Sequence, residues 1–183
     1  LMIPYGIDFV ISTFAMFKAG LIPVLIDPGL GRENILNCIK QVQPMGMVAT
    51  PLAHAIKFIF PSTFKSIKYN VTTGWFFGCT PLKKLKVLGN VDLKITSMAK
   101  EDIAAILFTS GSTGPPKGVL YTHKIFNHQV KILQEQFDIQ SNETDLPTFP
   151  LFGLFTCGLG MTSIIPNMDS SRPARVNPKN IIG

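Results

Sequence analysis

The strongest restriction on the fold of this chain comes from short apolar runs that alternate with helix-like stretches. Residues 22–26 and 45–49 are continuous apolar runs of strand length, and turn-forming residues follow each of them. Residues 7–19, 32–41 and 53–60 instead repeat their apolar side chains at helical spacing. An alternation of buried strands with helices is typical of βαβ units. We therefore expect an α/β fold in which a parallel-rich sheet is flanked by helices.

The rest of the chain is interpreted with the same rules. Five short segments have the composition of strands, namely residues 66–71, 85–88, 103–108, 119–121 and 146–151. Thr122 is a suitable N-cap for a helix that ends at Phe137, because its hydroxyl can accept a hydrogen bond from a free N–H group of the first turn. The chain begins inside an apolar run, and residues 180–183 have the composition of a first helical turn. We therefore expect a fragment of a longer protein whose sheet is incomplete.

Composition restricts the class of protein. Hydrophobic residues make up 46% of the chain and charged residues 15%, so most of it is too apolar for intrinsic disorder. Charged residues interrupt the apolar stretches before they reach the roughly 20 residues that cross a membrane. The three cysteines are widely spaced and form no metal-binding motif. We expect a cytoplasmic protein with reduced thiols and no transmembrane segment.

The charge is unevenly distributed. The net charge of +6 comes from 17 basic and 11 acidic side chains, and eight of the lysines lie between Lys57 and Lys100. A lysine cluster can bind nucleic acid or an anionic membrane, but this segment has no arginine and no interleaved series of aromatic residues. We expect a solvated face and no nucleic-acid partner. A basic interaction domain stays open as an alternative.

The segment Thr109–Gly118 lies between two predicted strands and carries the functional signal. Its ten residues include three glycines, four hydroxyl side chains, two prolines and Lys117. Glycines allow successive backbone N–H groups to face one anion, while the hydroxyls and the lysine add donors and positive charge. Such a loop suits a polyphosphate. It is not a G-x-x-x-x-G-K-[ST] loop, because Lys117 follows two prolines and precedes a glycine.

Several segments resemble one known family. Residues 107–119 resemble the phosphate-loop signature of the AMP-forming acyl-adenylate synthetases, a superfamily that includes acyl-CoA ligases, luciferases and the adenylation domains of peptide synthetases. Residues 17–28 are similar to a second signature of this family. Residues 145–155, 160–169 and 172–176 look like the β-lactone synthetases of olefin biosynthesis.

The resemblance implies that residues 1–183 are a partial N-terminal adenylation domain, truncated at both ends and without the C-terminal domain. The implied ligands are ATP and Mg²⁺. The resemblance assigns the phosphates to seven loop residues, Thr109, Ser110, Gly111, Ser112, Thr113, Gly114 and Lys117. Lys117 and Thr113 are the implied catalytic residues, and Thr109 and Thr113 are the hydroxyls implied near magnesium. We expect His123, which follows the loop, to have a structural role.

The implied substrate is a fatty acid, which is activated to acyl-AMP with release of pyrophosphate. Phe149, Phe152, Gly153 and Phe155 are the candidates for the acyl site, and core packing is the alternative for the three phenylalanines. Many acyl-CoA ligases carry a histidine at the position of Gly153. This departure favours a β-lactone synthetase, in which a β-hydroxyl of the substrate attacks within the acyl-AMP, over an enzyme that transfers the acyl group to CoA.

Two alternatives to a complete adenylating enzyme stay open. One is a truncated, catalytically incompetent ATP-binding fragment, because the family's ribose-binding aspartate and C-terminal lysine have no counterpart here. The other is a fatty-acid-CoA ligase that uses CoA as acceptor. The expected partners are a fatty acid and ATP, and a complex with other acyl-processing enzymes is compatible with this chemistry.

Overall fold

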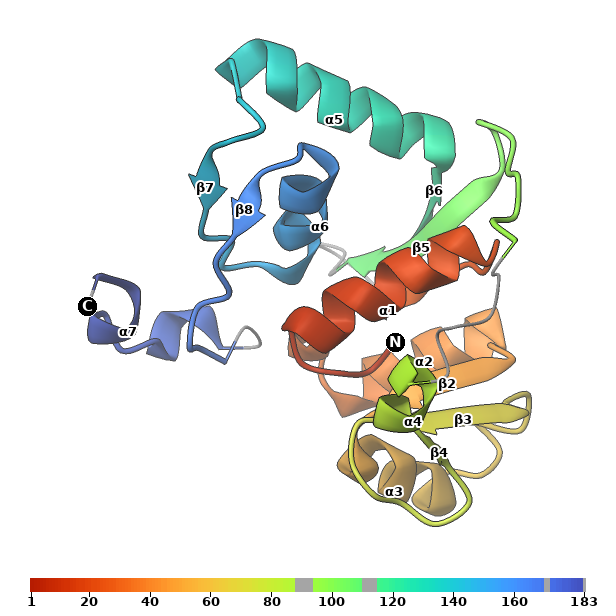
Figure 1. The fold of residues 1–183 in the computed structure, drawn as a ribbon. Coiled ribbons are helices and arrows are strands. Elements are labelled where there is room, and N and C mark those ends of the chain that lie inside the picture. The colour runs from red at the N-terminus through yellow and green to blue at the C-terminus, as the bar shows by residue number, and fades with distance from the viewer. Residues whose placement is uncertain (88–93, 110–114, 170–171, 183) are drawn as a thin grey trace. The chain divides into compact units, whose positions relative to one another are not determined.

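The computed structural model describes residues 1–87, 94–109, 115–169 and 172–182 (Figure 1). The chain divides into two compact units, each built from several segments. Unit 1 comprises residues 1–3, 22–96 and 105–120, and unit 2 comprises residues 4–21, 97–104 and 121–183. Among the described helices, none combines the length and the apolar character needed to cross a membrane.

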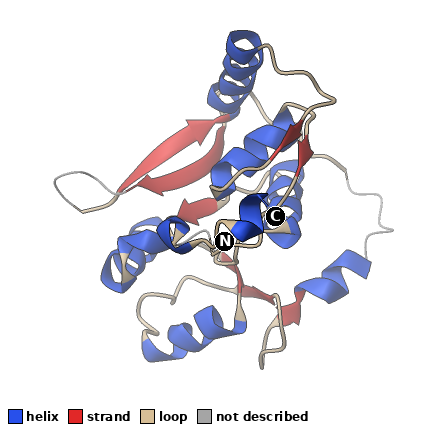
Figure 2. Cartoon of the chain, turned by 90° about the vertical axis from the view of Figure 1, so that its left-hand side faces the viewer, coloured by secondary structure: helices blue, strands red, loops and turns tan. Residues whose placement is uncertain are grey.

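Unit 1 contains two sheets of three strands. The first has the order β1 (Val24–Ile26), β5 (Ile103–Thr109) and β6 (Lys117–Thr122), although the first two residues of β5 and the last two of β6 belong to unit 2. In the second sheet, β3 (Tyr69–Thr72) lies between β2 (Gly46–Ala49) and β4 (Thr80–Pro81). The β1–β5, β2–β3 and β3–β4 pairs are parallel. In Figure 2 the strands are red, and the two longest, β5 and β6, lie side by side.

The core of unit 1 forms where two helices pack on β2. These helices are α2 (Arg32–Val42) and α3 (Pro51–Ile59), which lie before and after β2 in the chain. The core consists of five buried apolar side chains, those of Ile39, Met47, Ala49, Ala53 and Phe64. Its largest member, Phe64, is only 2% exposed. The remaining elements of unit 1 are the 3₁₀ helix η1 (Pro28–Leu30) and the short helix α4 (Leu82–Val87).

Unit 2 is mainly helical. It contains α1 (Ile7–Lys18), α5 (His123–Phe137) and α6 (Pro150–Gly158), together with the parallel pair β7 (Thr144–Asp145) and β8 (Thr162–Ser163). The 3₁₀ helix η2 (Pro173–Arg175) and α7 (Lys179–Ile182) follow near the C-terminus. The ring of Phe126 on α5 lies 6.0 Å from Phe17 on α1 and 5.9 Å from Phe155 on α6, measured between ring centres. Aromatic contacts therefore join the three helices.

Most of the predicted elements are confirmed. The helices expected over residues 7–19, 32–41 and 122–137 appear with ends within one residue of the expectation, because each repeats its apolar side chains at helical spacing. The helix predicted over 53–60 begins two residues earlier, at Pro51, since the Thr50 hydroxyl accepts a hydrogen bond from the N–H of Ala53. The expected parallel pairing is confirmed as well.

Two predicted strands are wrong. Residues 85–87 of the segment predicted as a strand over 85–88 belong to helix α4, and residue 88 lies outside the described residues. The sequence of α4 consists of leucines and lysines with one valine, and leucine and lysine are good helix formers.

The strand predicted over residues 146–151 is also absent from the described structure, where residues 146–149 are irregular and α6 begins at Pro150. Prolines at 147 and 150 cannot donate to a strand ladder, whereas proline is favoured in the first turn of a helix. The candidate acyl residues therefore lie on and beside a helix.

Candidate functional site

The two ends of the predicted phosphate loop are held in one sheet. Thr109 is the last residue of β5 and Lys117 is the first residue of β6, and these strands are neighbours. The remaining predicted phosphate ligands, Ser110, Gly111, Ser112, Thr113 and Gly114, lie outside the described residues. The structure therefore describes the supports of the loop, and the roles expected for the five central residues stay predictions.

Gly118 fixes the start of β6 against β5. A Cβ atom at this position would lie 3.0 Å from Phe108 Cζ and 3.3 Å from Ile106 Cγ2, which is closer than side chains normally approach. Phe108 is buried, with 4% of its surface exposed, so its ring has little room to move. The sequence predicts Gly118 as a loop residue that contributes backbone freedom. In the structure it is a strand residue that is needed for close packing.

Lys117 is the first residue of β6 and directly precedes Gly118, which packs on Phe108. Its side chain is exposed and forms no ion pair with any residue that the structure describes. By contrast, Pro116 is buried immediately before it. A lysine ammonium group without an ion-pair partner among the described residues is available to an external anion.

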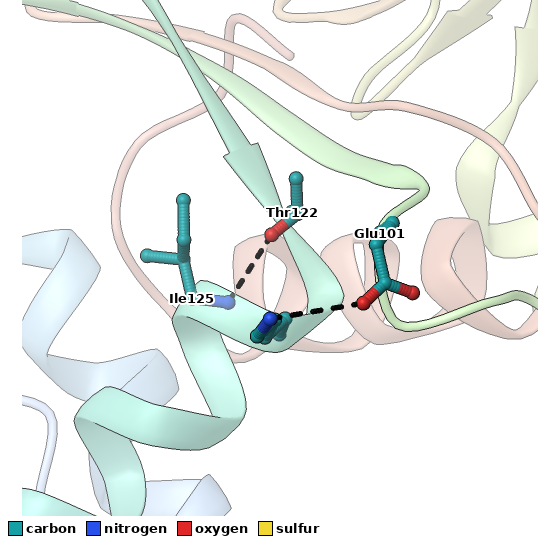
Figure 3. Close-up of polar contacts among 4 residues, drawn as sticks. Glu101, Thr122 and Ile125 are labelled. Carbon is teal, nitrogen blue, oxygen red and sulfur yellow. Dashed lines mark hydrogen bonds and ion pairs between the residues drawn. The ribbon is translucent and has the colours of Figure 1, made fainter.

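The segment after β6 is held by local hydrogen bonds in unit 2 (Figure 3). The Thr122 hydroxyl accepts a hydrogen bond of 3.2 Å from the N–H of Ile125, which caps α5 as predicted. The N–H of His123 donates to the carbonyl of Asp102 at 3.1 Å. An exposed ion pair of 3.8 Å links Lys124 to Glu101. His123 is thus the first residue of α5, and its ring lies 6.2 Å from that of Phe17, which agrees with the expected structural role.

The four candidate acyl residues do not share one environment. Phe149 and Phe152 are 44% and 58% exposed and contact each other edge to face, with ring centres 5.5 Å apart. Phe155 is partly buried and packs on Phe126 of α5. Gly153 is buried. Phe155 thus has the packing contacts of a core residue, while Phe149 and Phe152 offer an apolar surface at the start of α6.

Gly153 is covered by a tyrosine from a distant part of the sequence. A Cβ atom at position 153 would lie 2.1 Å from Tyr5 Oη and 2.7 Å from Tyr5 Cζ. The phenol oxygen therefore occupies the place where a side chain at 153 would begin. Sequence reasoning missed Tyr5, although the unusual glycine at 153 was the one signal that another residue fills this space.

Three polar side chains of unit 2 accompany Tyr5. Asp145 accepts a hydrogen bond from the hydroxyl of Thr156, which is only 2% exposed. Ser163 lies close to the Tyr5 hydroxyl, and both oxygens are buried. Burial raises the pKa of Tyr5, a side-chain hydrogen bond with Ser163 opposes this shift, and Cys157 and Asp145 add smaller contributions that raise it. We refer to Tyr5, Asp145, Thr156 and Ser163 as the Tyr5 cluster.

Comparison with known proteins identifies the family. Residues 1–166 match the AMP-binding enzyme family. The chain belongs to this family. It is 42% identical over 175 residues to the olefin β-lactone synthetase of Stenotrophomonas maltophilia, covering 93% of this chain and 31% of that protein. It is 40% identical over 178 residues to the olefin β-lactone synthetase of Xanthomonas campestris pv. campestris, covering 95% of this chain and 32% of that protein.

The chain thus spans about a third of the length of these AMP-binding relatives. Among solved structures, it resembles the apo structure of Mycobacterium smegmatis MbtA with a TM-score of 0.78 and 16% sequence identity. That match covers 88% of this chain and 32% of the MbtA chain. At such low identity the likeness concerns the fold, and it confirms the α/β class predicted from the sequence.

The described residues of this AMP-binding chain also bear on the magnesium prediction. They contain no group of three or more His, Cys, Asp or Glu side chains arranged to hold a metal ion. The predicted metal-binding hydroxyls are those of Thr109, at the end of β5, and Thr113, which lies outside the described residues. Magnesium carried by a nucleotide is bound largely by phosphate oxygens and water, so one or two protein oxygens fit this role.

Proposed function

We propose that this chain is part of the large N-terminal domain of an ATP-dependent enzyme that activates a fatty acid as an acyl-adenylate. The single observation that carries the proposal is the match of residues 1–166 to the AMP-binding enzyme family. The packed base of the phosphate loop, with Gly118 held against Phe108 and Lys117 exposed beside it, supports the same function.

The proposed reaction brings two anions together. An oxygen of the fatty-acid carboxylate attacks the α-phosphorus of ATP, the bond from that phosphorus to the bridging oxygen breaks, and pyrophosphate leaves with the bond electrons. The enzyme must therefore position the reactants and balance their negative charge. In this proposal the loop residues 109–114 donate hydrogen bonds to the phosphates, and Lys117 supplies a positive charge next to them.

Magnesium fits the proposed site as a partner of the nucleotide. When bound, it would neutralise charge on the phosphate oxygens. Thr109 and Thr113 are the protein hydroxyls that we propose beside it. This assignment rests on the family resemblance of the loop and on the position of Thr109 at its first anchor.

The finer proposal concerns the second half of the reaction. In a β-lactone synthetase, the β-hydroxyl oxygen of the activated acid attacks the acyl carbon, AMP leaves, and the hydroxyl proton passes to a base or to water. Two relatives at 40% and 42% identity bear this name. The glycine at position 153, where many acyl-CoA ligases have histidine, supports the same choice. Acyl transfer to CoA remains the second candidate.

We also propose that the 183-residue chain is catalytically incompetent by itself. The chain spans 31% and 32% of the two relatives, so it contains only part of the machinery of such an enzyme. A pyrophosphate-exchange assay on this chain and on the full-length protein tests whether the isolated chain lacks the activity of the full-length protein. We expect exchange only with the full-length protein, and exchange by the isolated chain would contradict this part of the proposal.

Substitution of Lys117 tests the adenylation site directly. Because loss of one well-placed group that stabilises developing charge typically lowers a rate by about 100- to 1,000-fold, Lys117→Ala in the full-length protein should reduce fatty-acid-dependent pyrophosphate exchange by a factor in that range. Lys131→Ala is the matched control, because Lys131 is an exposed lysine on α5 that forms an ion pair with Glu135. The control should keep its rate within about twofold, since exposed ion pairs contribute little. Unchanged exchange in Lys117→Ala would refute the assignment.

Analysis of the product distinguishes the two acceptors. A β-hydroxy fatty acid and ATP, without CoA, should yield a β-lactone and AMP. Formation of product only when CoA is added would instead support the acyl-CoA ligase.

A further inference from the structure

One loop of unit 1 presents aromatic rings to solvent. The loop between β3 and β4 carries Trp75, Phe76 and Phe77 in succession. Trp75 and Phe77 are each 82% exposed. Large apolar side chains that are exposed singly are common on protein surfaces, whereas neighbouring ones mark a surface that binds a partner. The two rings therefore call for an explanation.

Contacts with α3 hold this loop, which Figure 1 shows beside that helix. Phe76 is the anchor, because its ring stacks on His54 at 5.7 Å and lies 5.9 Å from that of Phe58, measured between ring centres. The backbone of Gly74 also packs closely, since a Cβ atom there would lie 2.9 Å from Pro51 Cγ. The exposed rings on either side of Phe76 are thus carried by a packed loop.

A third ring extends the apolar surface onto α3. Phe58, which contacts Phe76, is itself exposed. We refer to the exposed rings of Phe58, Trp75 and Phe77 as the aromatic tip. It combines residues from a helix and from a loop, and the ring of Phe76 joins the two.

The chain that forms the aromatic tip is basic. Residues 57–87 contain six lysines and no aspartate or glutamate. Lys57 lies near the loop, because burial raises the pKa of the Cys79 thiol and the charge of Lys57 opposes that shift. Lys83 and Lys84 are exposed on α4, which begins directly after β4. Charge complementarity therefore requires a negatively charged partner.

Apolar rings beside lysines match the surface of an anionic membrane. Tryptophan is enriched at the boundary between lipid headgroups and acyl chains. Lysines close to the surface are attracted by anionic headgroups. A single-stranded nucleic acid also stacks on aromatic rings, but residues 57–87 contain no arginine, which is the residue favoured in nucleic-acid contacts. A lipid surface thus accounts for more of the observations.

We propose that the aromatic tip docks the protein on an anionic lipid surface, where Trp75 and Phe77 insert among the headgroups and the lysines of α4 contact the anionic lipids. The contact is peripheral, so it requires no membrane-spanning segment. Lipid binding goes beyond the proposed function, and it can be measured without ATP or a fatty acid. Its failure would therefore leave the adenylation proposal untouched.

Co-sedimentation of the full-length protein with vesicles tests the docking. The wild type should bind vesicles of phosphatidylethanolamine and phosphatidylglycerol, and binding should weaken when salt is added or phosphatidylglycerol is omitted. Because burial of one aromatic side chain is worth about tenfold or more in affinity, Trp75→Ala combined with Phe77→Ala should weaken binding about 100-fold. Lys83→Gln combined with Lys84→Gln should weaken it about 30-fold, or about fivefold for each charge.

Two substitutions in unit 2 serve as controls. Phe137→Ala removes an exposed ring and Lys131→Gln an exposed lysine, and both variants should bind as the wild type does. A milder variant, Trp75→Phe, keeps an apolar ring at the tip and protects the test against misfolding of the double variants. Brominated lipid should quench more tryptophan fluorescence in the wild type than in Trp75→Phe, because the inserted Trp75 is missing from the variant.

Three results would overturn the proposal. The first is a wild type that does not bind vesicles containing phosphatidylglycerol. The second is binding that neither double variant weakens, or quenching that is equal in the wild type and in Trp75→Phe. The third is binding to single-stranded RNA without binding to vesicles, which would assign the aromatic tip to a nucleic acid instead.

Discussion

The interiors of the two units differ in how their polar groups are paired. Among the residues that the structure describes, each unit buries three polar side chains, which are His54, Thr63 and Thr72 in unit 1 and Ser12, Thr13 and Thr156 in unit 2. In unit 1, the ring of His54 makes a 2.9 Å hydrogen bond to the carbonyl of Val71, and the core beside it is apolar. In unit 2, the buried side-chain oxygens of Ser12 and Gln129 have no hydrogen-bond partner among the described residues.

This difference means that burial of polar side chains costs little stability in unit 1 and more in unit 2. A paired interior gains from burial without a penalty for lost hydration, which suits the unit that carries the base of the phosphate loop. An interior with unpaired polar groups gives up some stability. The comparison predicts where substitutions should change the stability most.

The largest effect is expected in the core of unit 1. Phe64→Ala removes a ring that is 2% exposed, and it should lower the free energy of unfolding by about 3–5 kcal/mol because a cavity remains. Denaturant unfolding of the full-length protein, combined with hydrogen exchange, would show whether the loss is confined to unit 1. Phe77→Ala is the control, since Phe77 is 82% exposed and should change stability by less than about 0.5 kcal/mol. Equal losses in both variants would contradict the proposed core.

The second-largest loss of stability is expected for a substitution of Gly153 in unit 2. Gly153→Ala places a methyl group 2.1 Å from the Tyr5 oxygen, and such overpacking should cost about 1–3 kcal/mol. The same substitution in a Tyr5→Ala background should cost much less, because the clashing ring is absent. In unit 1, Gly46→Ala should be neutral, since its nearest neighbour would be 4.0 Å away. Additive effects of the two unit 2 substitutions would show that Tyr5 does not fill this space.

Smaller losses of stability, equal to each other, are expected when the threonine caps of two helices are removed. Thr50 in unit 1 and Thr122 in unit 2 accept hydrogen bonds of 3.3 Å and 3.2 Å from backbone N–H groups three residues later. Thr50→Ala and Thr122→Ala should each cost about 1 kcal/mol, because capping is a local interaction. Thermal unfolding of both variants tests this equality. A much larger loss at one cap would mean that the units differ in local as well as in interior interactions.

The smallest expected effect is a pH dependence of the unfolding free energy that arises from Tyr5 in unit 2. Burial raises the pKa of Tyr5 in the folded state, so the folded protein holds this proton more tightly than the unfolded chain. The resulting stabilisation is complete below the ordinary tyrosine pKa of about 10 and is lost as the pH rises through the higher folded-state value. The difference in unfolding free energy between the wild type and Tyr5→Phe should therefore shift against the wild type as the pH rises above about 10. A difference that does not vary with pH would contradict the burial of this phenol.

The sequence alone correctly predicted those helices and strands whose formation depends on local interactions. The cap at Thr122 and the periodic stripe that follows it predicted α5, and the apolar run at 103–108 predicted β5. The segment 146–151 was predicted wrongly because its apolar residues outweighed its two prolines, which cannot donate to a strand ladder. The contact of Tyr5 with Gly153 could not be predicted, since it joins residues far apart in the chain.

The close approach of Gly118 to Phe108 has a practical consequence for engineering this enzyme. Sliding β6 by one residue would bring the side chain of Lys117 or Val119 against a ring that has no space for it. Insertions or deletions in residues 110–116 must therefore be absorbed before Gly118. A library that varies the composition of this segment, and keeps both its length and Gly118, should yield more folded variants than one that varies its length.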